Sequence, residues 1–261
     1  MLIGYGQPAL APSIDGATAT NLSALVDGRP SSVARVSGGG SGGVRLRADW
    51  ATATSVRIVA ALGLTCTAGT ALELTGKRAG DSEYGYALGG TATTQPVVEL
   101  VDGSRAAWWV LPEGNARLVG LQLEVAAGAF DIGELIVLQG VELPHEPGSS
   151  WDRIDPSIVA RTIGGALNVI PRRTYRRLRV RPTADYLDAV RGGGLANGMD
   201  WDKLVYALSA SARVAALLRW DDAAELHRTA VYGTAAAAAI THRAGPMFNT
   251  EQWTFEEIPP I

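Results

Sequence analysis

The sequence predicts a mainly β protein in which a β-sandwich comes first and an α+β unit follows. Up to about residue 143, short runs of Val, Leu, Ile and Thr are separated by Gly, Asn and Asp, which is typical of all-β proteins. Residues 144–150 interrupt this pattern, and beyond them strand patterns are mixed with one or two short helical ones. The 261 residues are enough for one large or two modest domains.

Seven runs in the first part of the chain predict strands, which is enough for a two-sheet sandwich. Within the run at 116–125, apolar residues at 121, 123 and 125 alternate with small or polar ones, as expected of a strand with one buried face. The glycine-rich segment 37–43 cannot hold a fixed backbone and is predicted to be a loop. The seven runs are VRLRADW (44–50), SVRIVAAL (55–62), ALELTG (71–76), PVVELVDG (96–103), AAWWVL (106–111), ARLVGLQLEV (116–125) and ELIVLQGVEL (134–143).

A domain boundary is predicted at residues 144–150, a segment rich in proline, glycine and serine. Residues 1–143 then form the sandwich, 144–150 a linker, and 151–261 the second domain. The net charge changes at the same place. Nine basic and thirteen acidic residues give −4 up to residue 143, whereas fourteen and thirteen give +1 from 144 onward.

The second part combines strand and helix patterns. Apolar residues alternate with arginines in 175–181, which predicts a strand that Pro182 ends. Residues 185–191 begin with Asp, end with Arg and precede three glycines, which predicts a short helix. Segment 200–220 fits one long helix, or a helix to about residue 208 and then a strand; the Ser-Ala-Ser interruption at 209–211 favours the second. The last predicted strands cover 226–232, 235–242 and 252–258.

Composition narrows the function classes. Charged residues make up only 19% of the chain, the hydrophobic share is 47%, and the net charge is −3, which suits a protein that buries part of its surface in an assembly. The single cysteine, Cys66, excludes an internal disulfide framework and a cysteine-rich zinc site. No signal-peptide pattern and no apolar run near the roughly 20 residues of a membrane span are present, so we expect a soluble protein without membrane insertion.

No catalytic motif with its required context is found, and we predict neither an enzyme nor a cofactor. The paired acids Asp221–Asp222 and Glu256–Glu257 are sequence neighbours, so on a strand each pair would point to opposite faces and could not share a proton. A glycoside-acting enzyme would need two facing carboxylates in a cleft, and the sequence nominates none. Asp27, in an Asp-Gly turn, is a weak candidate for a Ca²⁺ ligand, because that ion prefers carboxylate oxygens.

Three tryptophans are candidates for glycan contact, because aromatic faces stack on sugar rings. They are Trp50, Trp108 and Trp109. The last two are neighbours on a predicted strand and must face opposite ways, so at most one of them is expected to be exposed.

A row of arginines is the candidate subunit interface. Arg177, Arg179 and Arg181 share one face of the predicted strand, with Leu178 and Val180 on the other. The row could be a solvated edge strand or could pair with carboxylates of a neighbouring copy. No aromatic residue interleaves the arginines and the whole chain is acidic, so no nucleic-acid specificity is expected. The candidate partner carboxylates are Asp221, Asp222, Glu256 and Glu257.

The segment 21–32, NLSALVDGRPSS, together with the later strand series, resembles the opening of discoidin-like, galactose-binding-fold sandwiches. The resemblance covers about residues 10–143. It implies a small jelly roll and, in many members, binding of glycans or Ca²⁺ near that loop.

The second part contains four patterns, namely Trp-x-Arg-x-Asp at 151–155, the strand at 175–181, LHRTAVYG at 226–233 and FEEIP at 255–259. Taken in order, these patterns resemble the distal tail protein family of long, non-contractile-tailed bacteriophages. The resemblance implies a split β-barrel with a helix, related to the tail tube subunit. The order of the two domains is the reverse of that in familiar members, so another tail-tip adaptor is an alternative.

The leading functional hypothesis is therefore a structural virion protein of the tail tip, assembled in the host cytoplasm. The family resemblance implies a homo-oligomeric ring, hexameric in the family, between the tail tube and the host-adsorption apparatus. Its partners would be copies of itself, the tail tube, the tail-tip hub proteins and host-surface glycans. The alternative is a carbohydrate-binding, lectin-like module that forms no ring.

Overall fold

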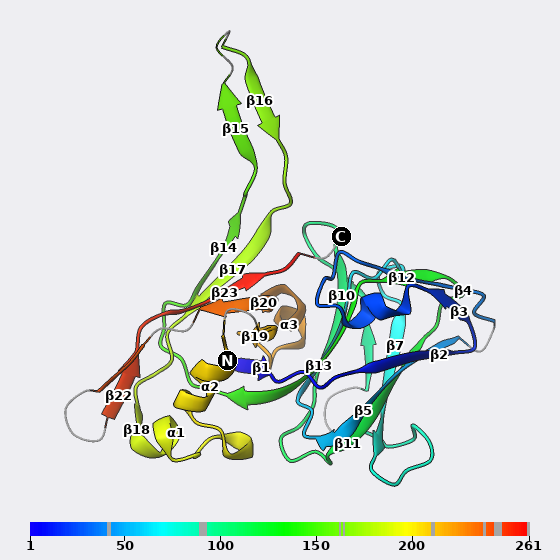
Figure 1. The fold of residues 1–261 in the computed structure, drawn as a ribbon, viewed down its shortest axis with the longest axis horizontal. Helices are drawn as coiled ribbons and strands as arrows, with labels where there is room; N and C mark the ends of the chain where they lie inside the picture. Colours follow the sequence, from blue (N-terminus) through cyan, green and yellow to red (C-terminus); the bar gives the residue numbers. More distant parts are fainter. Residues whose placement is uncertain are drawn as a thin grey trace.

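The structure, a computed structural model, describes residues 1–40, 43–88, 93–161, 163, 165–209, 212–236, 239–242 and 247–259. It confirms the mainly β fold class (Figure 1). The described ranges contain three short α-helices, α1 (Leu187–Arg191), α2 (Trp201–Ala207) and α3 (Ala223–Thr229), where one or two were expected. The described ranges also contain two short 3₁₀ helices, η1 (Leu22–Val26) and η2 (Ala196–Gly198). None of these helices is long and apolar enough to cross a membrane.

A ten-stranded antiparallel sheet runs through both parts of the chain. Its strand order is β14-β17-β23-β20-β19-β1-β13-β6-β10-β9. Strand β1 lies in the middle and pairs with β13 of the first part on one side and with β19 of the second part on the other. In sheet order the strands are Ser150–Ile154, Tyr175–Val180, Trp253–Glu257, Ala230–Ala236, Val214–Leu217, Leu2–Tyr5, Glu134–Glu142, Ile58–Leu62, Arg105–Val110 and Val98–Glu99.

A second sheet completes the expected β-sandwich. It contains β2 (Ala11–Asp15), β5 (Val44–Thr54), β11 (Leu118–Val125), β7 (Ala71–Arg78) and β8 (Thr94–Pro96), in that order. Leu46 and Leu123 from this sheet share a core with Val137 and Trp109 from the first. The alternation along 121–125 is confirmed, since the odd-numbered residues are buried there.

Smaller sheets decorate the two large ones. The first joins β12 (Phe130–Ile132), β4 (Ala34–Ser37) and β3 (Thr18–Thr20); the second joins β18 (Asp185–Tyr186), β22 (Met247–Thr250) and β21 (Ile240–His242). A separate two-stranded ribbon is formed by β15 (Ile158–Arg161) and β16 (Leu167–Ile170).

Both faces of the central strands are buried, which explains why β6 is apolar along its whole length. All five residues of Ile58–Leu62 are buried. One face of these strands contributes to the sandwich core. The other face, with Leu2, Trp108 and Ile136, packs against Leu226 of α3 and Tyr232 of β20. A third core joins Leu178 and Phe255 of the second part to Trp201 of α2.

The segment 226–232, predicted as a strand, is corrected by the structure. Residues up to Thr229 belong to helix α3, and β20 begins only at Ala230. The side chain of Asp222 accepts a hydrogen bond from the backbone N–H of Ala224 at 3.0 Å, so it caps the first turn of the helix. A helix of only two turns is too short to show its own periodicity in the sequence.

Other boundaries shift by a few residues. The helix expected at 185–191 begins at Leu187, because 185–186 pair with β22 as a strand. The run at 96–103 is broken after Glu99, where the N–H of Leu100 donates to the Ser104 carbonyl at 2.8 Å and turns the chain back. Of the glycine-rich segment 37–43, residues 41 and 42 lie outside the described residues, as do 237–238 within the predicted strand 235–242. The helix and strand expected within 200–220 are α2 and β19.

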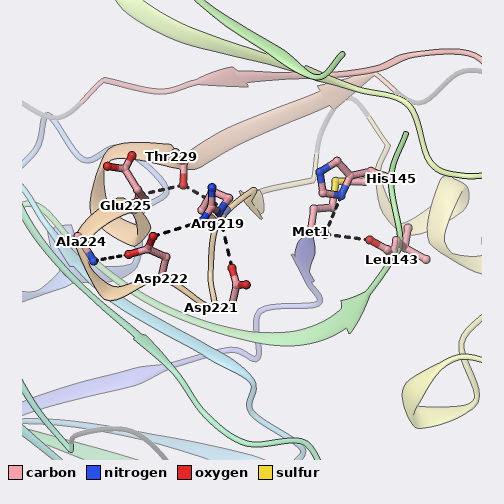
Figure 2. Close-up of polar contacts among 9 residues, drawn as sticks. All are labelled: Met1, Leu143, His145, Arg219, Asp221, Asp222, Ala224, Glu225 and Thr229. Carbon is pink, nitrogen blue, oxygen red and sulfur yellow. Dashed lines mark hydrogen bonds and ion pairs between the residues drawn. The ribbon is translucent and has the colours of Figure 1, made fainter. Parts of the chain in front are cut away.

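The segment 144–150 makes backbone contacts of its own. The N–H of Glu146 donates to the Arg181 carbonyl at 2.9 Å, and Met1 N donates to the Leu143 carbonyl at 2.9 Å, beside His145 (Figure 2). The division into units 1–143 and 151–261 stays a prediction, and Figure 1 shows them joined edge to edge through β1.

A protease recognition site inserted between Gly148 and Ser149 tests that division, since Gly148 is exposed. We expect the cleaved chain to stay folded, with its two fragments co-eluting in size-exclusion chromatography, because strand pairing with β1 survives the cut. Circular dichroism before and after cleavage checks the folding. Joint unfolding of both fragments on cleavage would show that the chain is a single folding unit.

Candidate functional site

The most exposed apolar surface is the ribbon of β15 and β16, which we call the arm. It continues the direction of β14 and β17 and projects away from the rest of the molecule (Figure 1). Every described residue of its two strands is exposed. Six of the nine exposed large hydrophobic side chains in the described ranges lie on the arm. These six are Ile158, Val159, Ile163, Leu167, Val169 and Ile170.

The two faces of the arm are both apolar. Ile158 lies opposite Ile170, and Val159 lies opposite Val169 on the other face, where Leu167 follows. An isolated two-stranded ribbon is only marginally stable in water. The arm therefore has the character of a surface that another molecule covers.

Polar contacts fasten the base of the arm. The N–H of Ser157 donates to the Asp155 carboxylate at 2.9 Å, and the N–H of Arg172, across the ribbon, donates to the Ser157 hydroxyl at 2.9 Å. The bonds from Ser157 hold the pKa of Asp155 below its usual range. These hydrogen bonds join the two chain segments at the point where the arm begins.

The arm was not predicted from the sequence, although the sequence contains a hairpin pattern there. Residues 158–161 and 167–170 are rich in β-branched and aliphatic side chains on either side of a segment with two glycines, which is typical of a hairpin.

The arginine row lies on the outward face of β17, with Leu178 and Val180 buried on the other, as predicted. Each arginine meets a carboxylate of its own chain. Arg177 donates to Asp152 at 2.9 Å, and Arg179 lies 3.5 Å from the same carboxylate. The hydrogen bond from Arg177 holds the pKa of Asp152 below its usual range.

The third arginine of the row, Arg181, lies 3.7 Å from Glu146. All three arginines thus have acidic neighbours inside the chain, and pairing with a second copy stays a prediction.

The four candidate partner carboxylates occupy two different environments. Arg219 lies between Asp221 and Asp222, at 3.9 and 3.3 Å, and Asp222 also caps α3 (Figure 2). Glu256 is partly exposed on β23, 3.9 Å from Arg177.

Glu257, on the opposite face of β23, is buried. It accepts hydrogen bonds from the side chain of Arg176 and, at 2.9 Å, from the Arg176 backbone N–H. Arg176 also donates to the Arg228 carbonyl at 3.0 Å. The opposite orientation of Glu256 and Glu257 agrees with the period of a strand.

The three candidate glycan tryptophans are in the interior. Trp50 is 6% exposed, and Trp108 and Trp109 are each 1% exposed. Trp108 and Trp109 do face opposite ways, but α3 covers the second face of their strand, so neither reaches the surface. This corrects the expectation that these side chains meet a sugar. The exposed indole is that of Trp151, on β14.

The Asp-Gly turn is tied to a buried acid that the sequence did not single out. Asp27 accepts a hydrogen bond from the Arg29 N–H at 2.7 Å, and the Gly28 N–H lies 3.3 Å from Glu134 on β13. Glu134 is fully buried, and burial raises its pKa to about 8. Within the described ranges, no three His, Cys, Asp or Glu side chains are close enough to hold a metal ion. A role for Asp27 as a calcium ligand stays a prediction.

No protein-family model matches this chain. No curated protein matches it either. Solved structures with a partial likeness include a family 32 carbohydrate-binding module of C. perfringens NanJ in complex with galactose, at 14% identity and a TM-score of 0.36 over 53% of this chain and 100% of that one.

Two further solved structures share a partial likeness. The lectin domain of lectinolysin complexed with Lewis B antigen has 12% identity and a TM-score of 0.36, over 51% of this chain and 94% of that one. A truncated AlyQ with CBM32 and alginate lyase domains has 12% identity and a TM-score of 0.32, over 70% of this chain and 54% of that one. All three TM-scores are low.

Proposed function

We propose that this chain is a structural subunit of a phage tail tip, which assembles with copies of itself into a ring between the tail tube and the host-adsorption apparatus. The observation that carries the proposal is the exposed apolar arm. The resemblance of the second part to distal tail proteins supports the location in the virion and the closed ring. In this role the chain binds its neighbours and performs no chemical step.

The arm supplies a physical reason for self-assembly. Burying a Val, Leu or Ile side chain that is otherwise exposed contributes about 1.5–3 kcal/mol. Several such side chains lie together on the arm, so a neighbour that covers them gains enough to offset the cost of association. An arm that reaches onto a different surface of the next copy makes a head-to-tail contact, and such contacts form a ring when the rotation from copy to copy closes and an open filament when it does not.

Replacing three apolar side chains on one face of the arm tests the proposal. The variant carries Val159→Ser, Leu167→Ser and Val169→Ser, whose positions share a face of the ribbon. We expect the unmodified chain to form closed oligomers in mass photometry and the variant to be monomeric. Its circular dichroism and melting temperature should not change, because every described residue of these two strands is exposed. A monomeric unmodified chain would contradict the proposal.

A second variant tests whether the subunit contact lies at the arginine row instead of the arm. It carries Arg177→Gln, Arg179→Gln and Arg181→Gln. These residues lie on β17 or directly after it, outside the arm, and offer charge in place of apolar area. We expect its oligomers to persist at low and high salt. Salt-sensitive loss of oligomers here, with an unaffected arm variant, would move the subunit contact to the arginine row.

Carbohydrate binding without ring assembly is the alternative function. The buried positions of Trp50, Trp108 and Trp109 remove the residues first expected to carry it. The exposed indole of Trp151 favours a different place on the surface for such a ligand.

A further inference from the structure

A cleft of about 550 Å³ lies where the two parts of the chain meet. Its walls are β9 with the turn that follows it, strand β14, the first residues of β17 and helix α3. Strands β14 and β9 are the two edge strands of the ten-stranded sheet. The sheet therefore curls until its two ends line one cleft, with α3 between them.

Apolar surface is exposed on two walls of this cleft. The indole of Trp151 is 57% exposed on β14, and Val101 is 90% exposed in the turn after β9. Trp151 and Arg153 are two residues apart on a strand, so their side chains share a face and their Cα atoms are about 6.6 Å apart. That spacing lets one small ring touch the indole while a substituent on the ring reaches the guanidinium.

Arg153 carries a positive charge that no carboxylate of the described residues neutralises through an ion pair. Within the part of the chain that the structure describes, the Arg153 guanidinium makes no side-chain hydrogen bond and no ion pair, although its charge helps to lower the pKa of Asp102. Arg176, its direct neighbour across the β14–β17 pair, is held by the buried carboxylate of Glu257. Arg228 also lines the cleft, 3.5 Å from Glu225, so Arg153 is the lining arginine whose side-chain N–H donors are left for a ligand.

Three carboxylates also line the cleft. Glu99 pairs with Arg105 at 2.8 Å on one wall, and Glu225 lies on α3. Asp102 is partly buried, which opposes its ionisation, but hydrogen bonds from Ser104, the closer at 2.6 Å, together with the charges of Arg176 and Arg153 outweigh burial and hold its pKa below the usual range. Carboxylates are acceptors only, so they suit a ligand that brings hydroxyl donors.

We infer that this cleft binds an acidic saccharide, a pyranose ring that carries a carboxylate. The apolar face of the ring stacks on Trp151, its carboxylate pairs with Arg153, and its hydroxyls donate to the acidic side chains of the opposite wall. Each component of such a ligand has a matching group in the cleft, and a neutral sugar would leave Arg153 unpaired.

The surrounding carboxylates argue against more highly charged ligands. A phosphate group or a nucleic-acid backbone would bring its charge close to Glu99, Asp102 and Glu225. Two of the three arginines that line the cleft already have acidic partners, because Arg176 is held by Glu257 and Arg228 lies 3.5 Å from Glu225. A purely apolar ligand would leave those carboxylates without the water they now contact. The inference does not depend on ring assembly, because every residue that it uses belongs to one copy of the chain.

Tryptophan fluorescence and isothermal titration of the full chain test the inference, with trigalacturonate and sialyllactose as acidic probes and lactose as the neutral one. We expect at least one acidic probe to bind about tenfold more tightly than lactose. Trp151→Ala should weaken that binding about tenfold or more, through loss of the stacking surface. Arg153→Gln should lower the affinity for the acidic probe to that for lactose.

Two control variants match these changes away from the cleft. Tyr206→Ala removes another exposed aromatic side chain, from α2, and Arg35→Gln removes an exposed arginine, from β4. Both should bind the acidic probe as the unmodified chain does, and so should the monomeric arm variant. No binding of either acidic probe, equal binding of lactose, or full binding by Trp151→Ala would each overturn the inference.

Discussion

A Glu257→Gln variant should lose about 3–5 kcal/mol of unfolding free energy, because it leaves the Arg176 guanidinium buried without its counter-charge. The two side chains are 11% and 5% exposed, so water cannot replace the lost carboxylate. Urea unfolding followed by tryptophan fluorescence measures the loss. Glu257 accepts the backbone N–H of Arg176 on one carboxylate oxygen and the guanidinium on the other, whereas a glutamine side chain offers only one acceptor oxygen.

The adjacent residue provides the matched control. Glu256→Gln makes the same chemical change one position earlier on β23, on the partly exposed face. We expect it to unfold at the same urea concentration as the unmodified chain, because water already screens the charge there. Equal losses in the two variants would show that burial of the Arg176–Glu257 pair is not what stabilises this edge.

A double variant separates the loss of the pair from the exposure of a lone charge. Replacing Arg176 and Glu257 together by Met removes both buried charges and fills similar volume. Its stability should lie well above that of Glu257→Gln. A double variant no more stable than the single one would mean that the backbone contacts to Glu257 carry most of the effect.

Glu134→Gln should change how stability depends on pH. Burial raises the pKa of Glu134 from 4.5 to about 8, so between these values the folded chain keeps a proton that the unfolded chain releases. The unfolded state then binds fewer protons, and the free energy of unfolding falls as pH rises through this window, by at most about 1.4 kcal/mol per pH unit. The Gln variant cannot titrate, so it should avoid that fall.

The difference between variant and unmodified chain is the quantity to measure, since other groups also titrate. Urea unfolding from about pH 5 to about pH 9 should show the Gln variant gaining in relative stability up to about pH 8 and then holding a constant advantage. Glu73→Gln, on the exposed side of β7, is the control, because both states present that side chain to water. Parallel curves for Glu134→Gln and the unmodified chain would show that Glu134 is already charged at neutral pH.

The environment of Glu134 explains why the effect should be large. Asp27 adds a nearby negative charge that raises its pKa further, while the Gly28 N–H and the charge of Arg213 act in the opposite direction. One Glu134 oxygen and the hydroxyl of Tyr232 have no hydrogen-bond partner within the described residues. A neutral carboxyl is therefore the form that this part of the core tolerates.

Part of the candidate site followed from local sequence. Alternation predicted which residues of 175–180 and 253–257 face inward, and the structure has Leu178, Val180 and Phe255 buried as expected. These predictions succeeded because side chains on a strand alternate with a period of two, whatever the strand packs against.

Local sequence did not predict which segments cover the second face of a strand, because those contacts come from residues far away in the sequence. Trp108 is buried because helix α3, more than a hundred residues later, packs over it. For the same reason the sequence could not tell that Glu134 is a buried acid, or that Trp151 is the exposed indole.

The sequence by itself determined the mainly β class, most strand positions and the outward row of arginines, all of which follow from local periodicity. Only the tertiary structure decided that β1 joins both parts in one sheet, that its two edge strands meet at the cleft around Trp151, and that the arm stands free. These features depend on pairings between segments far apart along the chain. Such pairings are chosen by the burial and hydrogen bonding of the whole molecule, which no local window of sequence contains.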